Sequence, residues 1–146
     1  MNKLLLILYI FCYTTGSFAA NSKDVDTRLT TLFGEYKPYK TFFYKLQRNV
    51  QKLNVQTLSE MMSYPLRTST HGKIQNKKEF ILNFEKLFNA KVKAAILNQK
   101  YSQLFSNWRG FMYGNGVVWV NGICDPKSTK KCLNVKVKVV TLNNGA

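Results

Sequence analysis

Apolar residues recur at helical spacing through the first half of the domain. Between residues 39 and 53 they return every three or four positions, with lysine, arginine and glutamine between them, which predicts an amphipathic helix. Pro38 suits the first turn of that helix, where a missing N–H costs nothing. Residues 80–88 repeat the spacing after a cap-like start at residues 76–79. A second long helix is therefore predicted there, followed by a short helical stretch over 92–97.

A short helix and then an extended segment should connect these two helices. Thr57 and Glu60 have the spacing of a capping box, in which Thr57 accepts from the Glu60 amide while Glu60 reaches back. Pro65 disfavours helical geometry at the residue before it and has no N–H to donate, so this helix must end before Pro65. Residues 66–74 are predicted to be extended, with a turn at His71 and Gly72.

The last third of the chain changes to a period of two, which indicates strands. Residues 108–113 and 116–123 are rich in strand-forming residues, and Asn115 followed by Gly116 is the strongest short hairpin signal. Residues 133–142 alternate, with valines and Thr141 on the face expected to be buried and lysines on the wet face. Helices followed by hairpin-linked strands predict an α+β domain, with N-terminal helices packed on a curved antiparallel sheet.

The composition indicates a folded, exported and strongly cationic protein. The chain has 146 residues, is 45% apolar and 14% aromatic, and carries 22 Lys and Arg against 7 Asp and Glu, a net charge of +15. Lys3, an apolar run over residues 4–13 and small residues before Ala19 form the pattern of a cleaved secretory signal peptide. The run is shorter than the roughly 20 apolar residues that span a bilayer. We expect a signal peptide over 1–19 and a single domain over 20–146, periplasmic or secreted, without a transmembrane segment.

Two cysteines remain once the signal peptide is removed. Cys124 and Cys132 form an even set in an oxidising compartment, which predicts one disulfide bond. A redox motif would have the spacing Cys-x-x-Cys, and a structural zinc site would need four ligands, so no metal is expected. The two cysteines flank a polar loop between the last two predicted strands. The bridge should therefore clamp a hairpin and contribute about 2.5 kcal/mol to stability.

Several short runs resemble the nuclear transport factor 2-like, or SnoaL-like, superfamily. They are Leu46, Gln47 and Val50, residues 62–67 (MSYPLR), residues 78–81 (KEFI), and residues 114–116 (GNG) with Trp119 and Cys124. The resemblance spans about residues 42–142 and implies a small exported bacterial protein with a cone-shaped α+β barrel. This superfold hosts isomerases, dehydratases, hydrolases and pure binding proteins, so it does not define an activity. Enzymatic members usually carry an Asp-His or comparable pair inside the cone, and no matching pair is present.

The remaining chemistry-bearing residues do not form a catalytic signature. His71 is the only imidazole and lies beside a glycine in a polar stretch, which is typical of a solvated turn. The carboxylates are unpaired in sequence, with Glu60 and Glu79 expected to cap helices. The sequence has no nucleophile elbow, phosphate-binding loop or metal-ligand cluster. We therefore expect no catalytic residues, no metal and no cofactor.

The positive charge has two interpretations. It could bind a polyanion, but only four of the 22 basic residues are arginine, the residue that bidentate phosphate or base recognition prefers. The lysines are spread along every predicted element, which is typical of a solvated surface. No specific nucleic-acid partner is therefore expected.

Aromatic residues beside two arginines suggest a ligand site. The segment of residues 64–67 leaves a helix and enters the sheet. Arg67 should therefore lie at an opening of the cone, where it can reach an anion. Arg109 lies on a neighbouring predicted strand. The aromatic residues expected to line the concave sheet are Tyr64, Trp108, Phe111, Tyr113 and Trp119. The alternative is that these rings only fill the core. The predicted ligand-binding set is Tyr64, Arg67, Trp108, Arg109 and Trp119.

These features favour a non-catalytic binding or interaction module of the bacterial envelope. Its partner would be an unknown small ligand or an acidic envelope protein, and a homodimer remains open. One alternative is a periplasmic inhibitor or immunity-type protein, which would bring down one stoichiometric partner. Another is a small cone-fold enzyme of isomerase or hydrolase type, which would hold His71 in a cavity alongside a carboxylate.

Overall fold

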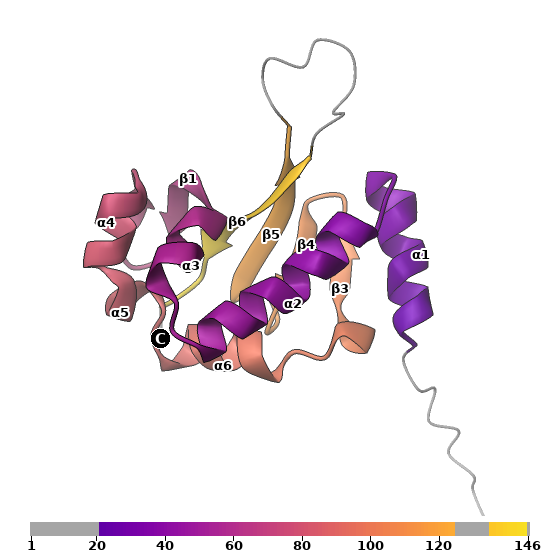
Figure 1. Ribbon diagram of the computed structural model, residues 1–146, viewed down its shortest axis with the longest axis horizontal. Coiled ribbons are helices and arrows are strands. Elements are labelled where there is room, and N and C mark those ends of the chain that lie inside the picture. Colours follow the sequence, from indigo (N-terminus) through magenta and orange to yellow (C-terminus); the bar gives the residue numbers. More distant parts are fainter. Residues whose placement is uncertain (1–20, 125–134, 146) are drawn as a thin grey trace, which may run out of the picture.

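The computed structural model describes residues 21–124 and 135–145 (Figure 1). The first helices are α1 (Ser22–Phe33), α2 (Lys37–Gln51) and α3 (Val55–Met61), followed by strands β1 (Met62–Thr68) and β2 (Gly72–Ile74). Helices α4 (Lys77–Leu82), α5 (Phe84–Leu87) and α6 (Ala90–Asn98) follow, with a 3₁₀ turn, η1 (Tyr101–Gln103). The chain then forms β3 (Phe105–Asn107), β4 (Gly110–Tyr113), β5 (Val118–Ile123) and β6 (Lys136–Leu142). The predicted signal peptide and Cys132 lie outside the described residues.

The described strands form one open, mixed sheet in the order β2-β1-β6-β5-β4-β3. The fold class is α+β, as the element order predicts. The expectation of a purely antiparallel sheet is wrong, because β1 and β6 pair in parallel while the other neighbours are antiparallel. A hairpin can only join antiparallel strands, whereas β1 and β6 are joined by a connection that includes most of the domain. Local sequence patterns therefore do not predict this parallel pairing.

Helix α2 packs one apolar face against the sheet, as its spacing predicts. Its buried residues are Tyr39, Phe42, Phe43, Leu46 and Val50. The ring of Phe43 stacks on that of Tyr113 in β4, with centroids 5.0 Å apart. The Tyr113 hydroxyl donates to the Phe43 carbonyl at 3.0 Å. In Figure 1, α2 crosses in front of β4 and β5, so one face of the sheet is covered by helix.

Two predicted helix starts have different outcomes. Helix α3 begins earlier than the predicted capping box, because the Asn54 side chain accepts from the Thr57 amide at 3.2 Å. Glu60 does not cap this helix and instead lies 3.6 Å from the Lys77 ammonium. The second start is confirmed, since Asn76 accepts from the Glu79 amide at 3.0 Å. The N-cap of α3 is therefore Asn54 and not Thr57.

Three elements differ from the periodicity. Helix α1 was not anticipated, although Asn21 caps it and two apolar residues four positions apart, Val25 and Leu29, are buried. The predicted helix over 80–88 is divided at Asn83 into α4 and α5. The predicted strand over 108–113 begins only at β4, because Trp108 and Arg109 form the turn of a hairpin with β3.

A bulge in β6 changes which face its last residues occupy. Val139 pairs with Val120 and Thr141 with Trp119, so Val140 is an extra residue on β6. The predicted position of Thr141 on the buried face is wrong. Thr141 shares a face with Trp119, and Leu142 takes the buried position instead.

Asn144 closes the C-terminal end of the fold through a buried hydrogen-bond cluster. Its side chain accepts from the Ser69 hydroxyl at 3.1 Å and donates to the Lys86 carbonyl at 3.3 Å. We expect Asn144→Ala to lower the free energy of unfolding by about 1–3 kcal/mol, because the buried groups lose their partners. Urea denaturation measures this loss. Asn98→Ala, at an exposed position that ends α6, is the control, and an equal effect of both substitutions would contradict the assignment.

Candidate functional site

A hollow of about 570 Å³ lies on the face of the sheet that α2 does not cover. Along β5, Val118 and Val120 are fully buried toward the core, whereas Trp119 and Asn121 between and after them line the hollow. Side chains of a strand alternate between its two faces. The hollow is therefore on the opposite face from the one that packs against Phe43. We call it the sheet hollow.

The sheet hollow has a floor and two opposite sides. Its residues are Ser63, Pro65, Arg67, Trp108, Arg109, Trp119, Asn121, Ile123, Val140, Thr141 and Asn143. Strands β5 and β6 are central in the sheet and supply the floor. Strand β1 lies on one side of them, and the β3–β4 turn that carries Trp108 and Arg109 lies on the other.

Four of the five predicted ligand-binding residues line the sheet hollow together. They are Arg67, Trp108, Arg109 and Trp119. They come from three separate stretches of the chain, which the strand order brings onto one face. The structure therefore places them as one group, although on the outer face of the sheet and not inside a space between helices and sheet.

Tyr64 does not belong to this group. Its hydroxyl donates to the Ser59 carbonyl at 2.8 Å, and its ring packs against the core. Burial raises the pKa of Tyr64 to about 12. Phe111 and Tyr113 are likewise fully buried in the core, so for these three rings the core-packing alternative is the correct one. Alternation along each strand separates them from Trp119.

The two arginines of the sheet hollow have no acidic neighbour among its lining residues. Each ion pair between described residues uses a lysine instead: Lys40 with Asp26, Lys77 with Glu60, and Lys93 with Glu85. The Arg109 guanidinium lies over the Trp108 ring, 5.2 Å from its centroid, a cation–π contact that leaves the edges of the guanidinium able to donate. The hollow is electropositive.

Both tryptophans of the protein line the sheet hollow. Trp108 is 76% exposed at the tip of the β3–β4 turn, and Trp119 is half-buried on the floor. A Cβ atom at Gly116 would lie 3.4 Å from the Trp119 indole nitrogen, so glycine lets the indole lie close to the β4–β5 turn. The hollow thus combines flat aromatic surface with guanidinium, hydroxyl and amide groups.

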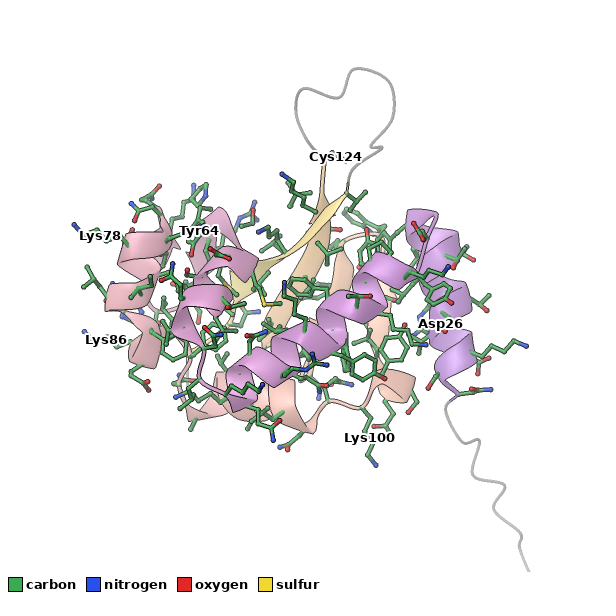
Figure 2. The ribbon with its side chains drawn as sticks, viewed as in Figure 1. Asp26, Tyr64, Lys78, Lys86, Lys100 and Cys124 are labelled. Atoms are coloured by element: carbon green, nitrogen blue, oxygen red, sulfur yellow. The ribbon has the colours of Figure 1, made fainter. Side chains whose placement is uncertain are left out.

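No lysine lines the sheet hollow, and the lysines of the described residues are distributed over the rest of the molecule. Figure 2 shows Lys78 and Lys86 at one end of the molecule and Lys100 apart from them at its lower edge. A second, wider hollow of about 740 Å³ lies between α2 and α3 and is mainly polar. Lys45 and Arg48 line it together with Glu60, so its charge is partly balanced.

The enzyme alternative gains no geometric support at the sheet hollow. His71 lies in the exposed turn between β1 and β2, where its Nδ1 is 2.6 Å from the Thr70 hydroxyl, and it lines neither hollow. Within residues 21–124 and 135–145, no three His, Cys, Asp or Glu side chains are grouped as metal ligands. Over the same residues no helix has the length and apolarity needed to cross a bilayer.

Sequence reasoning did not identify the polar floor of the hollow. Asn121 follows Trp119 at a spacing of two, so strand alternation alone would have placed it beside the indole. Thr141 was assigned to the opposite face because the bulge at Val140 has no sequence signature. Asn143 also lines the hollow, and its side chain donates to the Gly116 carbonyl at 2.6 Å.

A second polar cluster joins α1, α2 and η1. Asp26 accepts from the Lys40 ammonium at 2.8 Å and from the Tyr101 hydroxyl at 2.7 Å. Burial alone would raise the pKa of Asp26, but the hydrogen bonds from Lys40 and Tyr101 outweigh it and lower that pKa. The same contact raises the pKa of Lys40. None of these three residues lines either hollow, and their contacts link α1 to α2 and η1.

Asp26→Asn should therefore destabilise the protein in a pH-dependent way. A carboxylate whose pKa is lower in the folded than in the unfolded state stabilises the fold above the unfolded pKa, and this stabilisation disappears as pH falls through the folded pKa. We expect a loss of about 1.5–3 kcal/mol at neutral pH, measured by urea denaturation, because the hydrogen bonds are to a charged group. The loss should shrink in strong acid. A loss of the same size at both pH values would contradict this role.

Comparison with known proteins yields no match: no family model, curated protein or solved structure matches this chain. The function is therefore inferred from the site itself.

Proposed function

We propose that this protein is a non-catalytic binding module that holds a small anionic ligand in the sheet hollow. The observation that carries the proposal is the pair Arg67 and Arg109, which lie on opposite sides of a floor that contains the Trp119 indole, without a carboxylate among the lining residues. Arginine donates to carboxylate, sulfate or phosphate oxygens in a fixed fork geometry. An anion would supply the partner that the hollow does not.

The chemistry of the lining favours binding over catalysis. Guanidinium, hydroxyl and amide groups orient an anion through hydrogen bonds, but none of them exchanges protons near neutral pH. The indole of Trp119 offers a flat apolar surface next to these donors. The same set suits recognition of a ligand that has both a charged and an apolar part.

We also propose that the domain has the cone-shaped barrel of the nuclear transport factor 2-like superfamily and acts in the periplasm or outside the cell. The α+β element order and the packing of α2 on β4 support the fold. The sheet of the described strands is open. Export rests on the signal-peptide pattern of residues 1–19.

Tryptophan fluorescence tests the binding proposal, because both tryptophans line the sheet hollow. The protein is titrated with benzoate, sulfate and hexanoate, and with hexylammonium as a cation of matched chain. We expect a saturable change with at least one anion and none with the cation. The apparent Kd should rise with salt, because the arginines are solvent-exposed. Equal responses to anion and cation, or no response to any anion, would refute the proposal.

A further inference from the structure

One row of side chains crosses all six described strands on the outer face of the sheet. Strand pairing places Arg67 opposite Lys73 on one side and opposite Thr141 on the other. Pairing then continues from Thr141 to Trp119, and from Trp119 through Met112 to the edge strand. Paired residues of neighbouring strands share a face. This cross-sheet row consists of Lys73, Arg67, Thr141, Trp119, Met112 and Phe105.

The cross-sheet row is accessible to solvent along its whole length: Lys73, Arg67 and Phe105 are exposed, and the three residues between Arg67 and Phe105 are half-buried. None of its residues is buried, whereas the strand neighbours of Trp119, Val118 and Val120, are completely buried. Phe105 is 48% exposed at the edge of the sheet. This alternation confirms that the row faces away from the core.

The row has a charge gradient. Its β2 and β1 end carries Lys73 and Arg67, both exposed, and its β4 and β3 end carries only Met112 and Phe105. Trp119 lies between them on the floor of the sheet hollow. Four strand spacings separate Arg67 from Phe105, about 19 Å at the usual inter-strand distance. A cation and an apolar track are thus aligned on one face.

We propose that the cross-sheet row binds a single-chain amphiphile of the long-chain carboxylate type. The carboxylate accepts from the Arg67 guanidinium, and the alkyl chain lies across the indole of Trp119 toward Met112 and Phe105. This inference rests on the proposed function, since Arg67 is the anion-binding group in both. It adds the class of ligand and the direction in which that ligand lies.

Two other occupants fit the row less well. A second copy of the chain packed on this face would bury the guanidiniums in the interface, with no carboxylate among the lining residues to pair with them. A peptide strand binds to a sheet edge through its backbone, whereas this row crosses the strands at right angles. An acidic, flexible chain matches both the charge and the direction.

A series of carboxylates of increasing alkyl-chain length tests the inference on the whole domain, residues 20–146. Hexanoate, octanoate, decanoate and dodecanoate are titrated below their aggregation concentrations, with fluorescence and calorimetry as readouts. Complete burial of a methylene tightens binding roughly fourfold, and a chain with one side on an open face should gain about half of that free energy, or twofold per methylene. Dodecanoate should therefore bind about 60-fold more tightly than hexanoate.

Phe105→Thr tests the position of the chain, because it removes the apolar end of the row and keeps a strand-forming residue. We expect it to weaken dodecanoate binding several-fold and leave hexanoate binding unchanged. Leu82→Ala is the matched control, since Leu82 is 75% exposed on α4 and lies outside the row. In the unmodified protein, the Met112 methyl resonance should shift with dodecanoate and not with hexanoate.

The outcomes separate this inference from the proposed function. Arginine-dependent binding of hexanoate and dodecanoate with equal Kd would overturn the amphiphile and leave the anion site standing. Binding of neither would overturn the amphiphile, and it would overturn the anion site as well if benzoate and sulfate also fail to bind. A chain-length dependence that survives Phe105→Thr, or that falls equally in Leu82→Ala, would place the chain elsewhere and overturn the cross-sheet row. The inference would be supported if affinity rises steeply with chain length and only Phe105→Thr, not Leu82→Ala, reduces that rise.

Discussion

Phe43→Ala is expected to lower the free energy of unfolding by about 3–5 kcal/mol, the cost of removing a large ring from a packed core. Phe43 is only 1% exposed and is surrounded by other rings. Those rings belong to Tyr44, Tyr101, Phe111 and Tyr113, with centroid distances from 5.0 to 6.4 Å. Because α2 and β4 meet at this residue, the cavity would lie between the helix and the sheet and remove contacts that hold them together. Urea denaturation at neutral pH measures the loss.

Tyr44→Ala supplies the comparison, because Tyr44 is on the same helix but 45% exposed. Its loss should be clearly smaller than that of Phe43→Ala. Phe43→Leu keeps most of the volume and should remain folded if the alanine variant does not. An equal loss of unfolding free energy in the two alanine variants would contradict the assignment of Phe43 to the core contact between α2 and the sheet.

The double substitution Arg67→Ala, Arg109→Ala should weaken binding of decanoate by about tenfold to a hundredfold. A hydrogen bond to a charged group contributes about 1.5 kcal/mol, and solvent screening at these exposed side chains reduces that value. The Arg109 guanidinium lies over Trp108, so its removal also uncovers that ring. Calorimetric titration gives the two dissociation constants. Stability should change little, because neither arginine forms an ion pair with a described carboxylate.

Arg48→Ala, Lys52→Ala is the control for this experiment. It removes the same number of positive charges from exposed positions at the end of α2, away from the sheet hollow. We expect the control protein to bind decanoate with a nearly unchanged dissociation constant. Equal weakening in both double variants would show that the total positive charge attracts the anion, and that the sheet hollow has no special role.

Elements with local signals could be predicted from the sequence. The spacing of Phe43 and Leu46 placed α2, and Asn115 with Gly116 placed the β4–β5 hairpin, because both depend on residues close together in the chain. The parallel pairing of β1 with β6 depends on residues far apart and has no local signature. The bulge at Val140 depends on the partner strand as well, so the face of Thr141 was assigned wrongly.

The site could be predicted only by residue type. Arginine and tryptophan are scarce in this lysine-rich chain, and the prediction selected Arg67 and Arg109 as the polar contacts and both tryptophans as part of the aromatic wall. Strand alternation separates two faces but does not say which one the helices cover. Tyr64 was therefore grouped with residues on the opposite face, and the turn at Trp108 was taken for strand. The predicted disulfide stays a prediction, since Cys132 lies outside the described residues.

The most direct test of the anion site is the ¹H–¹⁵N spectrum of the two tryptophan indoles during titration with decanoate. Both indoles line the sheet hollow, so each cross-peak reports the site without further labelling. The account predicts that both peaks move with a single dissociation constant in the unmodified protein, and that Arg67→Ala, Arg109→Ala needs at least tenfold more decanoate for the same movement. Indole peaks that do not respond to decanoate, or that move equally in the double variant, would contradict it.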